Sequence, residues 1–205
     1  MPDTKIPQFI LASRNRHKTV ELRELLGIPP GNLIPASDCP GSPDPEENGA
    51  TFEENALIKA RALRDFTGKW TIADDSGLTV EALGGAPGIL SARYAGTHGD
   101  DAANNRLLIA TLAPHPRPWR AAYLCVIAIA APDGAEFTAT GACSGEIIPE
   151  EKGANGFGYD PFFIPDGFTQ TFAELPPEIK QSFSHRSRAA AKIRPLIARI
   201  INREA

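Results

Sequence analysis

Apolar and polar positions in the first part of the chain follow the order strand, turn, helix. The apolar run 8–12 predicts a short strand, and the polar turn 13–18 leads into a helix with a partial apolar face. A second helix is marked more clearly, because residues 51–54 (Thr-Phe-Glu-Glu) fit a capping box and Gly68 follows its last apolar position. This order is typical of an α/β protein.

The middle of the chain continues with strands and one further helix. The apolar run 70–73 predicts a buried strand that ends at the sequence Asp-Asp-Ser-Gly, residues 74–77. A helix is expected over 101–112. The apolar run 121–131, a Pro-Asp-Gly turn and the segment 136–148 then predict a hairpin. Because an antiparallel hairpin follows alternating helices and strands, we expect a mixed sheet with flanking helices.

The end of the chain predicts one more helix, over 187–202, with a kink or a break near Ala191 because Pro195 removes a backbone donor. Residues 35–50 are rich in Pro, Ser, Gly and acidic side chains, and predict an exposed, mobile loop. No internal repeat or biased linker divides the sequence. We therefore expect a single domain over 1–205.

Composition and charge exclude several classes of protein. The 205 residues are 42% hydrophobic and 22% charged, which excludes a disordered chain and leaves enough apolar surface for a core without disulfides. The net charge of −4 argues against nucleic-acid binding and attraction to anionic membranes. The three scattered cysteines predict reduced thiols. With no apolar run long enough to span a bilayer, we expect a cytoplasmic protein.

The strongest local signal for chemistry is the pair Asp74 and Asp75. Adjacent carboxylates at the end of an apolar strand could hold a hard divalent cation and orient a water molecule. The alternative is an ordinary turn, because Asp, Ser and Gly are all common turn residues. The acidic run at 44–47 has a similar alternative, a solvated loop.

Three other segments could bind parts of a nucleotide. The turn before the first helix carries Arg14, Arg16 and Lys18 and could bind phosphate, although it lacks the glycine pattern of a phosphate-binding loop. Residues 155–161 place two aromatic rings between glycines, where a base could stack; the alternative is a glycine-rich turn with buried rings. Cations at 180–186 could contact phosphate or purine oxygens, or simply cap a helix.

These motifs, in this order, resemble the inosine triphosphatase family of non-canonical purine nucleoside triphosphate pyrophosphatases. The resemblance covers nearly the whole chain. It rests on FILASRNRHKTVEL at 9–22, TFEENALIKARA at 51–62, IADDSGLTVEALGGAPGILSARYAG at 72–96, NGFGYDPFF at 155–163 and SHRSRA at 184–189.

The resemblance implies a fold, an activity and a set of site residues. It implies a twisted central sheet in two lobes around a substrate cleft, a homodimer, and Mg²⁺-dependent hydrolysis of ITP, dITP and XTP to the monophosphate and pyrophosphate. Asp75 would be the general base and would hold the metal with Glu47, with Asp74 as a supporting ligand. The substrate-binding residues would be Ser13, Arg14, Asn15, Arg16, His17 and Lys18 with Ser76 for the triphosphate, Phe157, Gly158, Tyr159 and Asp160 for the base, and Lys180, His185 and Arg186 for the purine and its 6-oxo group.

One position departs from the family pattern, and three rival functions stay open. The family has glycine before the loop lysine where this chain has His17, and a side chain there would strain the phosphate-binding loop if that position needs a positive φ. The rivals are a Maf-type pyrophosphatase acting on modified pyrimidine or methylated nucleotides, a catalytically silent nucleotide sensor, and a nucleic-acid-binding module.

Overall fold

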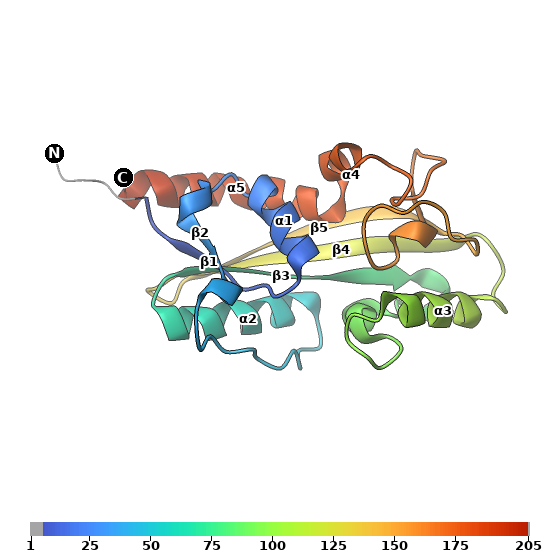
Figure 1. Ribbon diagram of the computed structural model, residues 1–205, viewed down its shortest axis with the longest axis horizontal. Coiled ribbons are helices and arrows are strands. Elements are labelled where there is room, and N and C mark those ends of the chain that lie inside the picture. The colour runs from blue at the N-terminus through green and yellow to red at the C-terminus, as the bar shows by residue number, and fades with distance from the viewer. Residues whose placement is uncertain (1–5, 205) are drawn as a thin grey trace. The chain divides into compact units, whose positions relative to one another are not determined.

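The structure is a computed structural model that describes residues 6–204, apart from the side chains of Arg16, Arg203 and Glu204. Its strands form a six-stranded sheet in the order β2-β1-β3-β4-β5-β6, with helices flanking it (Figure 1). The elements are β1 (Phe9–Leu11), α1 (Arg16–Leu25), β2 (Leu33–Pro35), α2 (Phe52–Thr67), β3 (Trp70–Val80), α3 (Asp101–Leu112), β4 (Trp119–Ala130), β5 (Glu136–Ile147), β6 (Phe163–Pro165), α4 (Pro177–Phe183) and α5 (His185–Glu204).

The sheet is mixed, as predicted. β1 pairs in parallel with both of its neighbours, so that Ile10 lies opposite Ile34 of β2 and Thr71 of β3. β6 pairs with β5 in the antiparallel direction. β4 and β5 are joined by a tight turn in which the N–H of Gly134 donates to the carbonyl of Ala131. The expected α/β class, helices and late hairpin are therefore confirmed, and the substrate cleft stays a prediction.

The chain divides into two compact units, each made of separate segments. Unit 1 comprises Met1–Asp75, Val126–Thr140 and Ser187–Ala205, and unit 2 comprises Ser76–Cys125 and Gly141–Arg186. The division falls inside β3, β4 and β5, so neither unit is a continuous stretch of sequence. Asp75 ends the first segment of unit 1, and Ser76 begins unit 2.

In unit 1, helices pack on both faces of the strands. α2 lies on one face, and α1 and α5 lie on the other (Figure 1). α2 begins as the sequence predicts, because the Thr51 hydroxyl accepts the N–H of Glu54, and it ends at Gly68 with a left-handed φ of 66°. Its buried side chains Ala56, Ala60 and Leu63 follow the helical period and join one core cluster with strand residues.

Unit 2 has a core rich in aromatic residues. Alternate residues of β4, namely Trp119, Ala121 and Tyr123, point into it, as do Leu108 and Leu112 of α3. The other buried members include Tyr159, Phe162, Phe163, Phe172 and Leu175. This core supports the segment 155–163, which carries one of the motifs singled out above.

Two expectations about the elements are wrong. The strand that begins at Trp70 does not end before Asp74 but continues to Val80, so the two aspartates lie within a strand. α5 is not broken near Ala191 but runs through Pro195, and the alternative of a kink stays a prediction. The residues buried along α5, Ala189, Ala190, Ile193, Ile197 and Ile200, recur at helical spacing, and this burial outweighs the loss of one backbone hydrogen bond.

Candidate functional site

The two aspartates of β3 are buried and have different lysine partners. Successive side chains on a strand point to opposite faces, so Asp74 and Asp75 cannot face the same helix. Asp74 pairs with Lys18 of α1, with 3.3 Å between Nζ and Oδ2, and Asp75 pairs with Lys59 of α2, with 3.1 Å between Nζ and Oδ1. The cations explain why a central strand tolerates adjacent carboxylates.

Lys59 bridges two acidic side chains. Its Nζ lies 3.1 Å from Asp75 and 3.2 Å from Oε1 of Glu47. Burial alone would lower the pKa of Lys59, but the charges of Asp75, Asp74 and Glu47 together outweigh burial, and the pKa is raised. Lys59 is therefore a stable cation in contact with two carboxylates. We call Lys18, Glu47, Lys59, Asp74 and Asp75 the carboxylate cluster.

The carboxyl group of Asp75 has a raised pKa. Burial raises the pKa of its carboxyl group above the ordinary value, and nearby Glu47 raises it further, whereas Lys59 and Lys18 lower it without cancelling the effect of burial. Oδ1 accepts a hydrogen bond from Lys59, but the buried Oδ2 accepts none from residues 6–204. One oxygen of a buried, relatively basic carboxylate is therefore available to a ligand or a water molecule.

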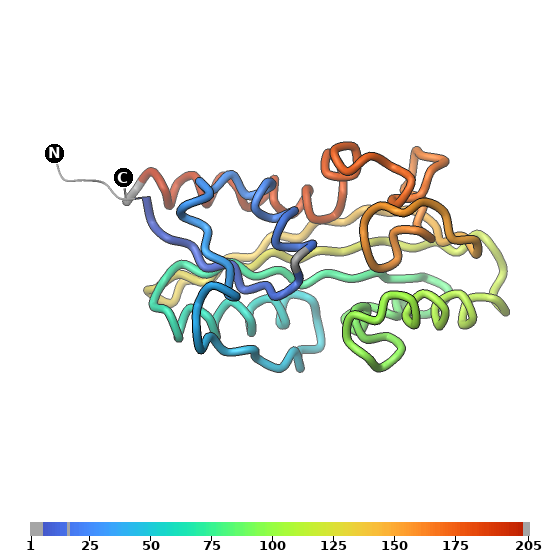
Figure 2. The backbone as a smooth tube through the Cα atoms, in the orientation of Figure 1, coloured from blue at the N-terminus to red at the C-terminus, as the bar shows by residue number. Residues whose placement is uncertain are grey.

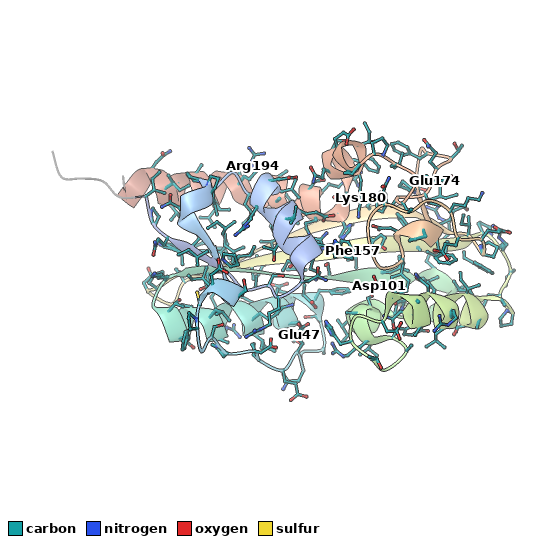
Figure 3. The ribbon with its side chains drawn as sticks, viewed as in Figure 1. Glu47, Asp101, Phe157, Glu174, Lys180 and Arg194 are labelled. Carbon is teal, nitrogen blue, oxygen red and sulfur yellow. The ribbon has the colours of Figure 1, made fainter. Side chains whose placement is uncertain are left out.

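The loop that carries Glu47 is fixed to the start of α2 (Figures 2 and 3). The N–H of Gly49 donates to Oδ1 of Asn55 at 2.8 Å, and the N–H of Ala50 donates to Oε2 of Glu54 at 2.6 Å. A Cβ atom at Gly49 would approach the Asn55 side chain too closely, so this tether needs glycine. The loop thus holds Glu47 near Lys59, which the acidic run in the sequence does not reveal.

The turn between β1 and α1 is shorter than predicted, because α1 begins at Arg16. Asn15 caps the helix by accepting the N–H of Lys18 at 3.1 Å. Arg14 is exposed and contacts the loop instead, donating to the carbonyl of Ser42 and pairing with Asp44 at 3.3 Å. Ser13 is half-buried, and the side chain of Arg16 lies outside the described part of the chain.

His17 does not need the conformational freedom of glycine. It is exposed in the first turn of α1, and in the range 6–204 no residue other than glycine has a positive φ. The concern that a side chain at this position strains the loop is therefore removed. Lys18, one residue later, belongs to the carboxylate cluster through its contact with Asp74.

The acidic side chains of unit 1 suit a magnesium ion that shares its ligands with a substrate. Within residues 6–204, no three His, Cys, Asp or Glu side chains gather closely enough to form a complete metal site. Mg²⁺ commonly takes one or two carboxylates and completes its shell with water and substrate phosphates. Glu47 and the unpartnered Oδ2 of Asp75 fit that requirement.

In unit 2, the turn at 155–160 presents one aromatic ring to cations. Phe157 is half-buried, Nζ of Lys180 lies 5.1 Å from its ring centroid, and Cζ of Arg186 lies 5.9 Å from it (Figure 3). Oδ2 of Asp160 accepts both the N–H of Phe157 at 3.0 Å and Nζ of Lys180 at 2.6 Å. Asp160 therefore fixes the ring and the cation together.

The second aromatic residue of this turn, Tyr159, lies in the core and not at the surface. Tyr159 is buried in the core of unit 2, where its hydroxyl donates to the carbonyl of Ser91 at 2.8 Å. Burial raises the pKa of this hydroxyl, and the charge of Asp101 adds to the shift. Of the two rings that the sequence singled out, Phe157 is thus the one at the surface of the turn, next to Gly158.

His185 and Arg186 are buried beside the same turn. The ring of His185 stacks on Tyr123, with 4.7 Å between centroids and 11° between planes. Burial raises the pKa of the Tyr123 hydroxyl, and the adjacent negative charge of Asp160 raises it further. Arg186 is only 1% exposed and donates through Nη2 to the hydroxyl of Ser76 at 2.9 Å. We call Phe157, Asp160, Lys180, His185 and Arg186 the aromatic cluster.

Sequence reasoning missed Lys59 and Tyr123. The sequence does hold a signal for Lys59. It is a charged residue beside the buried stripe of α2, three residues after Ala56 and one before Ala60. Tyr123 lies in an apolar strand and gives no comparable signal. The predicted site residues are otherwise gathered by unit: Lys18, Glu47 and Asp75 in unit 1, and Ser76 with the aromatic cluster in unit 2.

Comparisons with known proteins agree with the predicted resemblance. The model of the Ham1 family matches residues 9–196. A protein of Leifsonia xyli subsp. xyli named dITP/XTP pyrophosphatase is 49% identical over 192 residues, covering 93% of this chain and 95% of that protein.

Solved structures show the same fold. A HAM1 protein from Coxiella burnetii is 40% identical, with a TM-score of 0.86 over 94% of this chain and 99% of that one. A nucleoside-triphosphatase / dITP/XTP pyrophosphatase from Mycobacterium abscessus is 46% identical, with a TM-score of 0.75 over 92% of this chain and 99% of that one. With the fold, the motifs and these relatives in agreement, the chain belongs to the Ham1 family.

Proposed function

We propose that this protein hydrolyses the non-canonical purine nucleoside triphosphates ITP, dITP and XTP to the nucleoside monophosphate and pyrophosphate. The observation that carries the proposal is the environment of Asp75, a buried carboxylate with a raised pKa and one unpartnered oxygen between acidic and basic neighbours. Relatives named dITP/XTP pyrophosphatase at 44–49% identity support the choice of substrate.

Asp75 is the proposed general base. A carboxylate whose pKa is raised accepts a proton more readily than an ordinary aspartate, so Asp75 is suited to take one from the attacking water. Lys59 holds Oδ1 and so fixes the direction in which Oδ2 points. Glu47 and Asp75 would hold Mg²⁺, which when bound neutralises phosphate charge and orients the water.

The cations of unit 1 are proposed to bind the triphosphate. A nucleoside triphosphate carries about four negative charges, which must be offset before water can approach phosphorus. Lys18 and Lys59 are part-buried and close to the carboxylates, and the amides at the start of α1 add donors. Ser13 and Asn15 complete the proposed phosphate-binding turn, with Arg14, Arg16 and His17 at its edge and Ser76 next in sequence to Asp75.

The aromatic cluster is proposed to bind the base. The ring of Phe157 offers a stacking face, and Lys180 and Arg186 can only donate hydrogen bonds. Donors suit the 6-oxo group of hypoxanthine or xanthine, whereas the 6-amino group of adenine would leave buried donors unpaired. His185, Gly158, Tyr159 and Asp160 frame this cluster.

The remaining expectations concern the setting of the enzyme. Among residues 6–204, no helix is long and apolar enough to cross a membrane. We propose a homodimer that acts in the cytoplasm on the nucleotide pool. We also propose that the two units belong to one enzyme domain, because the family match at residues 9–196 includes segments of both.

A substrate panel tests the proposal. We expect kcat/KM for ITP and XTP with Mg²⁺ to exceed that for ATP by at least about a hundredfold, the range that an unpaired buried donor can supply. Preference for dUTP, dTTP or 5-methyl-UTP would instead indicate a Maf-type activity. Tight binding of ITP without any product over hours would indicate a nucleotide sensor.

A further inference from the structure

We propose that Asp101 and Asn105 of α3 are positioning residues for base recognition, because they clamp the peptide groups of Gly158 and thereby fix the ring of Phe157. The inference rests on the proposed function, since it assigns to these residues a role in binding the purine. It concerns residues of unit 2 alone.

The clamp consists of hydrogen bonds to both polar groups of one residue. The N–H of Gly158 donates to Oδ2 of Asp101 at 2.7 Å, and the carbonyl of Gly158 accepts from Nδ2 of Asn105 at 3.0 Å. Residues 101 and 105 are one helical turn apart and lie on the same face of α3. A rigid helix therefore presents an acceptor and a donor at the spacing of the glycine's own N–H and C=O.

The segment that they hold needs such support. Gly156 and Gly158 both have a left-handed φ, of 77° and 63°, so the residues on either side of Phe157 have little conformational restriction of their own. Together with the bond from the N–H of Phe157 to Asp160, side chains bind three of the four polar main-chain groups of Phe157 and Gly158. The ring between them is half-buried and lies under two cations, where a purine would stack.

Alanine variants at the two clamp positions, with two matched variants, test this role. Asp101→Ala and Asn105→Ala each remove one arm, and Asp101→Asn keeps an acceptor oxygen for the N–H of Gly158. Asp100→Ala is the control: Asp100 caps α3 by accepting the N–H of Ala103, so its loss weakens the helix without removing a bond to Gly158.

We expect both alanine variants to raise KM for ITP about tenfold with kcat within about twofold. This pattern is expected when the lost interaction stabilises the bound substrate and the transition state equally. Calorimetry should show IMP binding weakened by the same factor, while the inhibition constant of pyrophosphate stays unchanged. Asp101→Asn should restore KM to within about threefold of the wild type. Asp100→Ala should lower the melting temperature and leave KM unchanged.

The outcomes separate this inference from the proposed function. Folded alanine variants with unchanged KM and IMP affinity would overturn the clamp, as would an equal rise of KM in Asp100→Ala. If Asp101→Ala does not fold, Asn105→Ala decides alone. If the wild-type protein binds IMP but does not hydrolyse ITP, the proposed function is refuted and calorimetry still tests the clamp. If the wild-type protein does not bind IMP, the proposed function and the clamp are both refuted.

Discussion

Replacing Lys59 with glutamine should raise the pKa of Asp75. Lys59 is the nearest cation to this carboxylate, at 3.1 Å from Oδ1, and it lowers a pKa that burial has already raised. Glutamine keeps most of the side-chain volume and one donor but removes the charge. The change therefore separates electrostatics from packing.

Coulomb's law sets the scale of this effect. At 3.1 Å the attraction is about 1 kcal/mol with the dielectric constant of water and about 5 kcal/mol with an effective value of 20, or about one to four pKa units. Asp75 is largely buried, so we expect a rise of at least about one unit. Since the base must be unprotonated, the acid limb of the pH–rate profile should move to higher pH.

The pKa can be measured by NMR titration of the metal-free protein with ¹³C-labelled aspartate carboxyl groups. Arg61→Gln is the matched control, because Arg61 stands two residues away on α2 and pairs with Glu136. Glu47→Gln should have the opposite sign and lower the pKa of Asp75, since Glu47 raises it. An unchanged or lowered pKa in Lys59→Gln would refute the electrostatic reasoning about this cluster.

Further substitutions test three separate parts of the structure. Asp75→Asn should lose most turnover without a lower melting temperature, because the folded state no longer buries a charge that it disfavours. A raised carboxyl pKa costs stability as pH rises through it, so the free energy of unfolding of the Asn variant relative to the wild type should grow from acid to neutral pH. A difference that does not change with pH would contradict the raised pKa. Gly77→Ala should destabilise the protein by about 1–3 kcal/mol in thermal or denaturant unfolding, because a methyl group there overlaps a buried serine hydroxyl, whereas Gly31→Ala, which meets nothing within 4 Å, should not. Tyr159→Phe should cost about 1 kcal/mol of stability and leave KM for ITP within about twofold. Phe157→Ala should raise KM for ITP about tenfold or more. Equal effects of the two variants on KM would contradict the assignment of Phe157 as the stacking ring.

Local patterns predicted the elements well where a local cause controls them. The capping box at Thr51, the left-handed Gly68 and the range of α3 all appear as expected. The strand through Asp74 was missed because its cause is not local: lysines on two different helices neutralise the carboxylates. α5 continues through Pro195 for a similar reason, since burial along its length is a tertiary effect.

The candidate site shows the same limit. Glu47 and Asp75 were expected from the family motifs, but the cation between them was not, because Lys59 meets both only after α2 folds beside β3. Likewise, the sequence of the turn at 155–160 cannot tell which ring is buried. The hydrogen bond from Tyr159 to Ser91 decides it, and that contact joins residues 68 positions apart.

The identity of the products tests the central claim most directly. When ITP and Mg²⁺ are incubated with the purified protein and followed by ³¹P NMR, we predict the appearance of IMP and pyrophosphate in equal amounts. Release of orthophosphate with IDP would place the cleavage at the wrong anhydride bond and would contradict the account.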